Sequence, residues 1–256
     1  MTGQGKTWQS TQCPAAVIGS EVRLIALDAD DTLWDCQSHF EKVEHRLCEV
    51  LAPWCGAEEA AAALFSTERS NMQQLGYGSK AFTISLMETA LRMSKHRISP
   101  AVLAELVGMG KALGDMPATP LPGVESTLQQ LHRQWVEQRG LQMVVFTKGE
   151  LLEQEHKLMR SGLKHLFTDS FVVSNKDEDA YRLLCHRLQV EPTQLLMVGN
   201  SFKSDVAPAL RIGAYAAHIP YHVVWQLECS EEFDHPRLVR LNTFSDLLEQ
   251  LQPLLQ

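Results

Sequence analysis

The chain has 256 residues, of which 45% are apolar and 21% are charged, and its formal net charge is −8. This length allows one sizeable hydrophobic core, or a core with a smaller accessory domain. The negative charge argues against a broad nucleic-acid-binding face, because a phosphate backbone requires clustered Lys and Arg. It does not exclude a small phosphorylated substrate held by a local site.

The cysteine pattern and the hydropathy of the chain indicate its compartment. None of the six cysteines forms a CxxC pair, so we expect reduced thiols in a cytosolic protein. No apolar run has the roughly 18 residues that a membrane span needs, and the N-terminus has no signal-like pattern. We therefore expect a cytoplasmic protein without a membrane partner. Residues 1–20 are interpreted as an N-terminal lead-in.

Short apolar runs rich in Val, Ile and Leu predict β-strands that are buried on both faces. In chain order they are Arg23–Asp28, Gln142–Thr147, Phe167–Ser174, Leu195–Asn200 and Ala214–Ile219. Helix-start and helix-stop signals between them predict helices at Val124–Val136, Glu150–Ser161, Asp177–Leu188 and Asp205–Ile212. The alternation predicts an α/β, Rossmann-like parallel sheet, whose ligand site lies beyond the carboxyl ends of the strands.

The long connection after the first strand interrupts this alternation. It predicts only helices, at Ser38–Leu51, Ala57–Phe65, Phe82–Met93 and Pro100–Met109, and it is too long for a single crossover. We interpret residues 34–117 as an inserted all-helical cap, and residues 21–33 and 118–256 as the α/β core.

The segment Asp28-Ala29-Asp30-Asp31-Thr32 follows the first strand directly. Two carboxylates spaced two residues apart at a strand end, Asp28 and Asp30, suit a nucleophile with an acid/base partner, or a divalent cation. An acidic turn that caps a helix is the alternative.

Further polar residues follow later strands. Thr147 and Lys148 stand where a strand opens onto a helix, which suits an anion site or an ordinary helix cap. Lys176 is suited to neutralise a phosphate as a point charge. The alternative interpretation is a solvated loop lysine. Gly199 permits a tight turn before Asn200, and Asp205 lies early in the next helix.

In this order and placement, the motifs resemble those of the haloacid dehalogenase-like (HAD) hydrolase superfamily, in its phosphatase branch with a helical C1-type cap. Asp28, Asp30 and Thr32 match its DxDxT motif, and Thr147 and Lys176 match its second and third motifs. The fourth motif, GD followed by a second Asp, is matched by Gly199 and Asp205. Two positions depart from the pattern: Asp31 replaces a common Gly and Asn200 replaces a common Asp.

The resemblance implies a Mg²⁺-dependent phosphomonoesterase with a small phosphorylated substrate. Asp28 would be the nucleophile and Asp30 the acid and base. Mg²⁺ would bind Asp28, the backbone carbonyl of Asp30, and Asp205. Thr147, Lys148 and Lys176 would hold the phosphate, with Asn200 and Asp31 adjacent to the metal shell.

Two other functions stay open at this point. A haloacid dehalogenase would use the same nucleophile, but it generally lacks an acid at the position of Asp30, because a halide leaves without a proton. A non-enzymatic phosphoacceptor module would be shorter and would have no helical insertion. Substrate choice is expected in the cap, where two glycines flank Tyr77 and place Tyr77 or Lys80 near the substrate, unless this segment only connects two helices.

Overall fold

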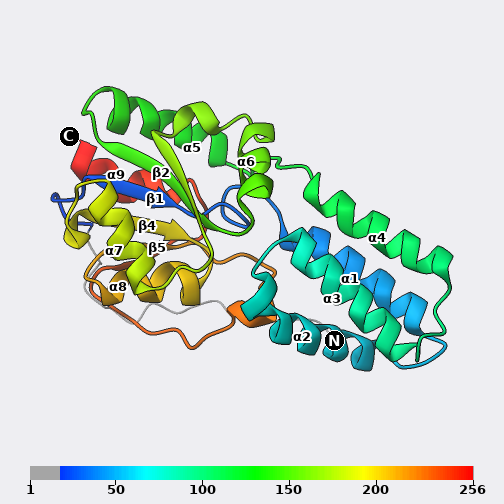
Figure 1. Ribbon diagram of the computed structural model, residues 1–256. Helices are drawn as coiled ribbons and strands as arrows, with labels where there is room; N and C mark the ends of the chain where they lie inside the picture. The colour runs from blue at the N-terminus through cyan, green and yellow to red at the C-terminus, as the bar shows by residue number, and fades with distance from the viewer. Residues whose placement is uncertain (1–17, 256) are drawn as a thin grey trace.

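The computed structural model of the protein describes residues 18–255. Its centre is one parallel sheet of six strands, in the order β3-β2-β1-β4-β5-β6 (Figure 1). The strands are β1 Leu24–Leu27, β2 Gln142–Lys148, β3 Asp169–Val173, β4 Leu195–Gly199, β5 Tyr215–His218 and β6 Leu238–Arg240. The parallel α/β fold is therefore confirmed. The sixth strand was not predicted, because its three residues are too short for a recognisable apolar run.

Helices cover both faces of the sheet (Figure 1). The strands alternate their side chains, so that Ile25 and Leu27 belong to one hydrophobic cluster while Leu24 and Ala26 belong to another. The first cluster includes residues of α5 (Val124–Leu131), α6 (Leu151–Arg160) and α9 (Asp246–Leu255). The second includes residues of α7 (Glu178–Arg187) and α8 (Ala207–Arg211). A π-helical turn, His132–Glu137, continues α5.

The insertion after β1 is all-helical, as predicted, and lies to one side of the sheet (Figure 1). It consists of α1 Gln37–Leu51, α2 Ala57–Leu75, α3 Ser79–Met93 and α4 Pro100–Gly114. These helices share their own hydrophobic cluster, which includes Leu47, Leu64, Leu86 and Leu106. We call this four-helix segment the cap. Its sequence boundaries stay a prediction.

Helix α2 ends at Leu75, not at Phe65 as predicted. The polar run that suggested a loop is accommodated inside the helix. The hydroxyls of Thr67 and Ser70 donate to the carbonyls of Ala63 and Ser66, at 2.9 and 3.1 Å, respectively. Local polarity was therefore a poor sign of a helix end here.

The start of α3 contacts the sheet domain directly. Both the backbone N–H and the hydroxyl of Ser79 donate to Oε2 of Glu153 on α6, at 2.9 and 2.7 Å. Glu153 is buried, and the Nζ atom of Lys157 lies 3.7 Å from its other oxygen. The first turn of α3 is thus fixed to the same helix that faces the carboxyl ends of the strands.

Other sequence expectations concern compartment and chain ends. Cys36, Cys48, Cys55, Cys185 and Cys229 are free thiols, and Cys13 lies outside the described residues. Within residues 18–255, no helix combines the length and apolar character needed to cross a bilayer. Most of the lead-in predicted for residues 1–20 lies outside the described residues, although Ile18 is buried in the core.

Candidate active site

Asp28 follows β1 directly and is buried. Its backbone N–H donates to the carbonyl of Val198 on β4 at 2.9 Å, which continues the ladder one residue beyond the strand. One carboxylate oxygen accepts from Thr32 Oγ1 at 3.1 Å, and the other contacts Nζ of Lys176. The carboxylate is therefore held at the carboxyl edge of the sheet.

Lys176 links Asp28 to Asp205. Its Nζ atom also lies 2.7 Å from Oδ1 of Asp205, and all three side chains are buried. Burial and the neighbouring Asp205 carboxylate raise the pKa of Asp28 to about 7, although Lys176 acts in the opposite direction. One ammonium therefore does not compensate two buried carboxylates. Asp28 and Lys176 lie in loops that follow β1 and β3, and Asp205 lies in the π-helical turn Phe202–Val206, so three separate segments bring these side chains together.

Gly199 brings Asp205 close to the end of β4. A Cβ atom at position 199 would collide with the Asp205 carboxylate, and the other oxygen of that carboxylate is held by Lys176. Asp205 also accepts from the backbone N–H of Ser201 at 2.9 Å. The glycine is thus required by a close approach of a functional side chain.

We therefore expect Gly199→Ala to lower kcat/KM by at least about 10-fold, because a displacement of the order of 1 Å is costly at an active site. The measurement is steady-state turnover of any substrate found for the wild type. Gly108→Ala is the matched control, since a Cβ there meets nothing within 4 Å. It should preserve activity and leave stability equal or higher, because Ala is the better helix former. Unchanged turnover in Gly199→Ala would contradict the proposed role of Asp205.

Asn200 and Thr32 contact each other beside Asp28. The backbone N–H of Asn200 donates to Thr32 Oγ1 at 3.1 Å, and the Thr32 hydroxyl lies 3.2 Å from the Asn200 side-chain oxygen. Asn200 lines the cavity described below. A neutral amide at this position leaves Asp28 and Asp205 as the carboxylates nearest to Lys176.

Asp31 adopts a left-handed backbone conformation, with φ of 62°. Gly takes this conformation without strain, and Asp tolerates it better than most residues do. Its carboxylate accepts from the backbone N–H groups of Cys36 and Gln37 at 2.8 and 3.0 Å, at the start of α1. Burial nevertheless raises its pKa to about 7. Asp31 thus has a structural role where the chain enters the cap.

Asp30 is held by three side chains. Nζ of Lys157 lies 2.7 Å from both carboxylate oxygens, Gln154 Nε2 donates at 2.7 Å, and Trp34 Nε1 donates at 2.8 Å. Burial acts to raise the pKa of Asp30, but these partners, Lys157 above all, hold it below its usual value. Asp30 and Asp28 line the same cavity. Trp34 itself is fully buried and does not line that cavity.

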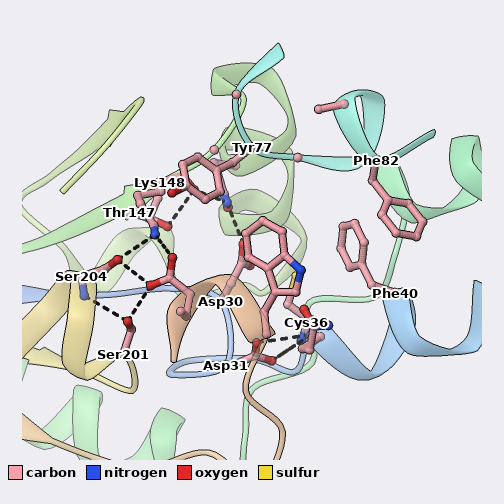
Figure 2. Close-up of a pocket in the computed structure, with 18 of the residues that line it drawn as sticks. Asp30, Asp31, Cys36, Phe40, Tyr77, Phe82, Thr147, Lys148, Ser201 and Ser204 are labelled. Atoms are coloured by element: carbon pink, nitrogen blue, oxygen red, sulfur yellow. Dashed lines mark hydrogen bonds and ion pairs between the residues drawn. The ribbon is translucent and has the colours of Figure 1, made fainter. Parts of the chain in front are cut away.

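Thr147 and Lys148 lie at the end of β2, and both line the cavity. Nζ of Lys148 lies 2.6 Å from Oε1 of Glu228 and donates to Ser204 Oγ at 2.8 Å. It also lies 4.3 Å from the centre of the Tyr77 ring. Figure 2 shows Lys148 between Tyr77 and Ser204. The Lys148 ammonium therefore has a carboxylate, a hydroxyl and an aromatic ring as its partners in this structure.

Glu228 belongs to the short 3₁₀ turn Gln226–Glu228, in the connection between β5 and β6. It accepts from the hydroxyls of Ser201 and Ser204 at 2.6 and 2.5 Å. Burial acts to raise its pKa, but Lys148 and the two serines lower it. This connection therefore supplies a charged side chain to the carboxyl edge of the sheet.

A cavity of about 170 Å³ lies between the sheet edge and the cap (Figure 2). Tyr77 lines it and packs edge-to-face against Trp225, with ring centres 5.8 Å apart. Lys80, proposed with Tyr77 as a specificity residue, lies outside this lining and pairs with Glu150 at 3.1 Å. Lys176 is also outside this lining, and it contacts Asp28 and Asp205, which line the cavity.

Several residues at the site carried no recognisable sequence signal: Gln154, Lys157, Glu228, Trp225 and Glu68. The spacing of Glu153, Gln154 and Lys157 places them on one helical face of α6. Such a polar face normally indicates solvent, yet all three side chains are buried. These side chains are buried because α6 packs beside Asp30, which the sequence does not reveal.

The donor set fits a divalent cation. Asp28 and Asp205 supply carboxylate oxygens, the ligands that Mg²⁺ prefers, and the two carboxylates share the single ammonium of Lys176. Among residues 18–255 no three His, Cys, Asp or Glu side chains gather closely enough to form a metal site alone. The Asp30 carbonyl, water and substrate oxygens would have to complete the coordination.

Comparison with known proteins places this geometry in a family. A model of haloacid dehalogenase-like hydrolases matches residues 22–213. No curated protein sequence matches the chain significantly. A haloacid dehalogenase-like family hydrolase from Xanthomonas campestris is similar in structure, with a TM-score of 0.80, 29% identity, and coverage of 91% of this chain and 92% of that one.

Two more distant structures share the fold. A predicted phosphoglycolate phosphatase from Haemophilus somnus has a TM-score of 0.57 at 17% identity, with 90% and 97% of the two chains covered. L-2-haloacid dehalogenase from Xanthobacter autotrophicus has a TM-score of 0.62 at 18% identity, with 90% and 98% covered. The same fold thus accompanies names from two different chemistries. Since the family model spans most of the sequence, the chain belongs to the haloacid dehalogenase-like hydrolases.

Proposed function

We propose that this hydrolase is a Mg²⁺-dependent phosphomonoesterase that acts on a small phosphorylated metabolite through Asp28. The observation that carries this proposal is Asp30. Its carboxylate lines the same cavity as Asp28 and is held by Lys157, Gln154 and Trp34. A leaving alkoxide needs a proton and a halide does not, so a positioned acid/base group beside the nucleophile favours phosphate esters.

The proposed reaction has two steps. In the first, a carboxylate oxygen of Asp28 attacks phosphorus, the bond from phosphorus to the ester oxygen breaks, and Asp30 gives a proton to the leaving alkoxide. In the second, Asp30 takes a proton from water, the water oxygen attacks phosphorus, and the bond to Asp28 breaks. The products are the alcohol and inorganic phosphate, Asp28 is again a carboxylate, and Asp30 again carries the proton with which the first step began.

Asp30 has to carry a proton in the first step and none in the second. Without substrate, Lys157 holds its pKa low, which suits the second step. A bound phosphate dianion would raise this pKa, because like charges disfavour the ionised carboxylate. Asp30 would therefore take up a proton from solvent when the phosphate ester binds, and would release it when inorganic phosphate leaves.

The remaining residues hold charge in place. Lys176 contacts the nucleophile, while Thr147 and Lys148 face the cavity where the phosphoryl oxygens would lie. Asp28, the Asp30 carbonyl and Asp205 would hold Mg²⁺, whose charge would offset the repulsion between the carboxylate and the phosphate. Asn200 would orient a water molecule in place of a charged ligand.

The proposal is tested by a hydrolysis screen of phosphorylated sugars, nucleotides, and two- and three-carbon phosphate esters. We expect phosphate release with Mg²⁺, and its loss in EDTA with recovery on adding Mg²⁺ back. Halide release from 2-haloacids is measured in parallel. Halide release without phosphate release, or phosphate release that EDTA leaves unchanged, would overturn the assignment.

A further inference from the structure

The cavity has two chemically different ends. At the sheet edge it is lined by the catalytic carboxylates and by Lys148 and Lys157. At the cap it is lined by apolar and acidic side chains of α1, α2 and α3: Phe40, Glu44, Glu68, Met72 and Phe82. We call these five residues the cap subsite. Figure 2 shows Phe40 and Phe82 together on this side, away from Lys148 and Ser204.

Glu68 is the unusual member of the cap subsite. Its residue is 7% exposed, and its Oε2 atom is buried without a hydrogen-bond partner among the described residues. Burial and the nearby Glu44 raise its pKa to about 8, although a hydrogen bond with Trp225 opposes them. A buried carboxyl oxygen without a partner is costly. Its location on a cavity wall indicates that the partner is a ligand.

The charges around Glu68 indicate the sign of that ligand. Burial and Glu41 also raise the pKa of Glu44, despite an opposing effect of His45. Among the described residues that line the cavity, the Lys and Arg side chains are Lys148 and Lys157. Both lie on the sheet side and are paired with carboxylates. The cap subsite therefore holds two carboxyl groups whose negative charge, when they ionise, no lining cation offsets.

Neighbouring polar groups do not serve Glu68 either. The amide nitrogen of Asn71 donates to Ser85 Oγ and Glu88 Oε2, both at 3.1 Å. The Ser85 hydroxyl donates to the carbonyl of Ala81 at 3.0 Å. These donors are used within the cap, so the cap itself leaves Glu68 Oε2 unsatisfied.

We propose that the cap subsite binds a protonated amine on the alcohol part of the substrate, so that the enzyme hydrolyses phosphate monoesters of amino alcohols. This inference rests on the proposed phosphatase function. An ammonium would give Glu68 both a hydrogen bond and an opposite charge. A carboxylate or a second phosphate at the same place would be repelled by Glu68 and Glu44.

The aromatic residues of the cavity agree with this choice. Phe40 and Phe82 pack edge-to-face with ring centres 5.0 Å apart, and Tyr77 and Trp225 form a second such pair. Aromatic faces attract cations, and apolar walls suit the methylene chain between an amine and a phosphate. The aromatic walls would thus contact the methylene chain of the substrate, while the carboxyl groups of the cap subsite would bind its amine.

The experiment compares three series of phosphate monoesters of equal length. One carries a terminal amine on two to five carbons, one has a hydroxyl in its place, and one has a methyl group. For the best chain length, we expect kcat/KM of the amine to exceed that of both analogues by about 10- to 100-fold, as for a hydrogen bond to a charged group. A hydroxyl analogue that matches the amine would overturn the inference.

Glu68→Gln keeps the shape of the side chain and removes its charge. We expect the ratio of kcat/KM for the amine to kcat/KM for the methyl analogue to fall to within about 3-fold of unity, mainly through a higher KM for the amine. The variant should fold, because it removes a carboxyl group whose charge is costly to bury. Glu59→Gln, on the exposed face of the same helix, is the matched control and should keep the preference.

The two hypotheses fail in different ways. Hydrolysis of all three series at similar rates, or an amine preference that survives in Glu68→Gln, would overturn the cap subsite and leave the phosphatase intact. No hydrolysis of any series or of the general ester screen would overturn the phosphatase, and the amine inference with it.

Discussion

Asp28→Asn is expected to lower phosphate release by at least about 10³-fold, because an amide oxygen is a poor nucleophile and the covalent step is lost. The substitution changes one atom and keeps the Thr32 hydroxyl within reach. The measurement is kcat for the best ester of the screen, at saturating Mg²⁺. A variant that keeps more than about a tenth of the wild-type kcat would rule out Asp28 as the nucleophile.

This loss must be separated from unfolding. Asp28 and Asp205 share one lysine, and the pKa of Asp28 is raised to about 7 mainly by burial. Removing one of the two carboxylates should therefore leave the midpoint of thermal unfolding unchanged or higher near neutral pH. Asp179→Asn is the control for activity, because that side chain is 95% exposed on α7.

Lys157→Met is expected to lower the free energy of unfolding by about 3–5 kcal/mol, the usual cost of removing one partner from a buried ion pair. The Lys157 side chain is 1% exposed, and its ammonium lies against both Asp30 and Glu153. Urea unfolding at pH 7 gives the value. The exposed variant Lys164→Met should stay within about 0.5 kcal/mol of wild type. Turnover should fall as well, because Asp30 loses a partner that fixes its orientation.

A double variant shows whether the cost arises at Asp30. Asp30→Asn combined with Lys157→Met removes the charge that the single variant leaves unpaired. It should therefore be more stable than Lys157→Met alone, by at least about 1 kcal/mol. A double variant as unstable as the sum of the two singles would assign the cost to lost packing or to Glu153.

The same pair predicts a dependence on pH. Burial opposes both charges, yet Lys157 lowers the pKa of Asp30, and Asp30 raises that of Lys157. The stabilisation is thus complete above the unfolded pKa of Asp, about 4, and below that of Lys, about 10. It is lost as the pH falls through the lowered pKa of Asp30. The stability difference between wild type and Lys157→Met should therefore be smaller at pH 3 than at pH 7.

The fold, and the site residues at the carboxyl ends of the strands, could be predicted because each sequence signal was local. A buried apolar run ending in a polar residue identifies a strand end, and parallel pairing brings strand ends to one edge. This rule assigned Asp28, Thr147 and Asn200 to strand ends. β6 escaped it because only three residues pair with β5.

The partners of these residues could not be predicted in the same way. Lys157 and Gln154 lie in the polar run Glu153–Lys157 of α6, and Glu68 lies in the polar run Ser66–Asn71 of α2; both runs are typical of solvent-exposed helix faces. Their burial depends on how the cap meets the sheet, which is a property of tertiary packing and not of spacing. Lys148 lies at the end of β2, but its partner Glu228 comes from a connection whose path no local sequence pattern specifies.

Helix α6 contacts the cap through one turn and Asp30 through the next. Glu153 accepts two hydrogen bonds from Ser79, and Lys157, four residues later, holds Asp30. The residue that anchors the cap and the residue that holds Asp30 thus lie one turn apart on a single helix. A ligand that strengthened the Ser79–Glu153 contact would act on the same helix that orients Asp30, and any such coupling would be reciprocal.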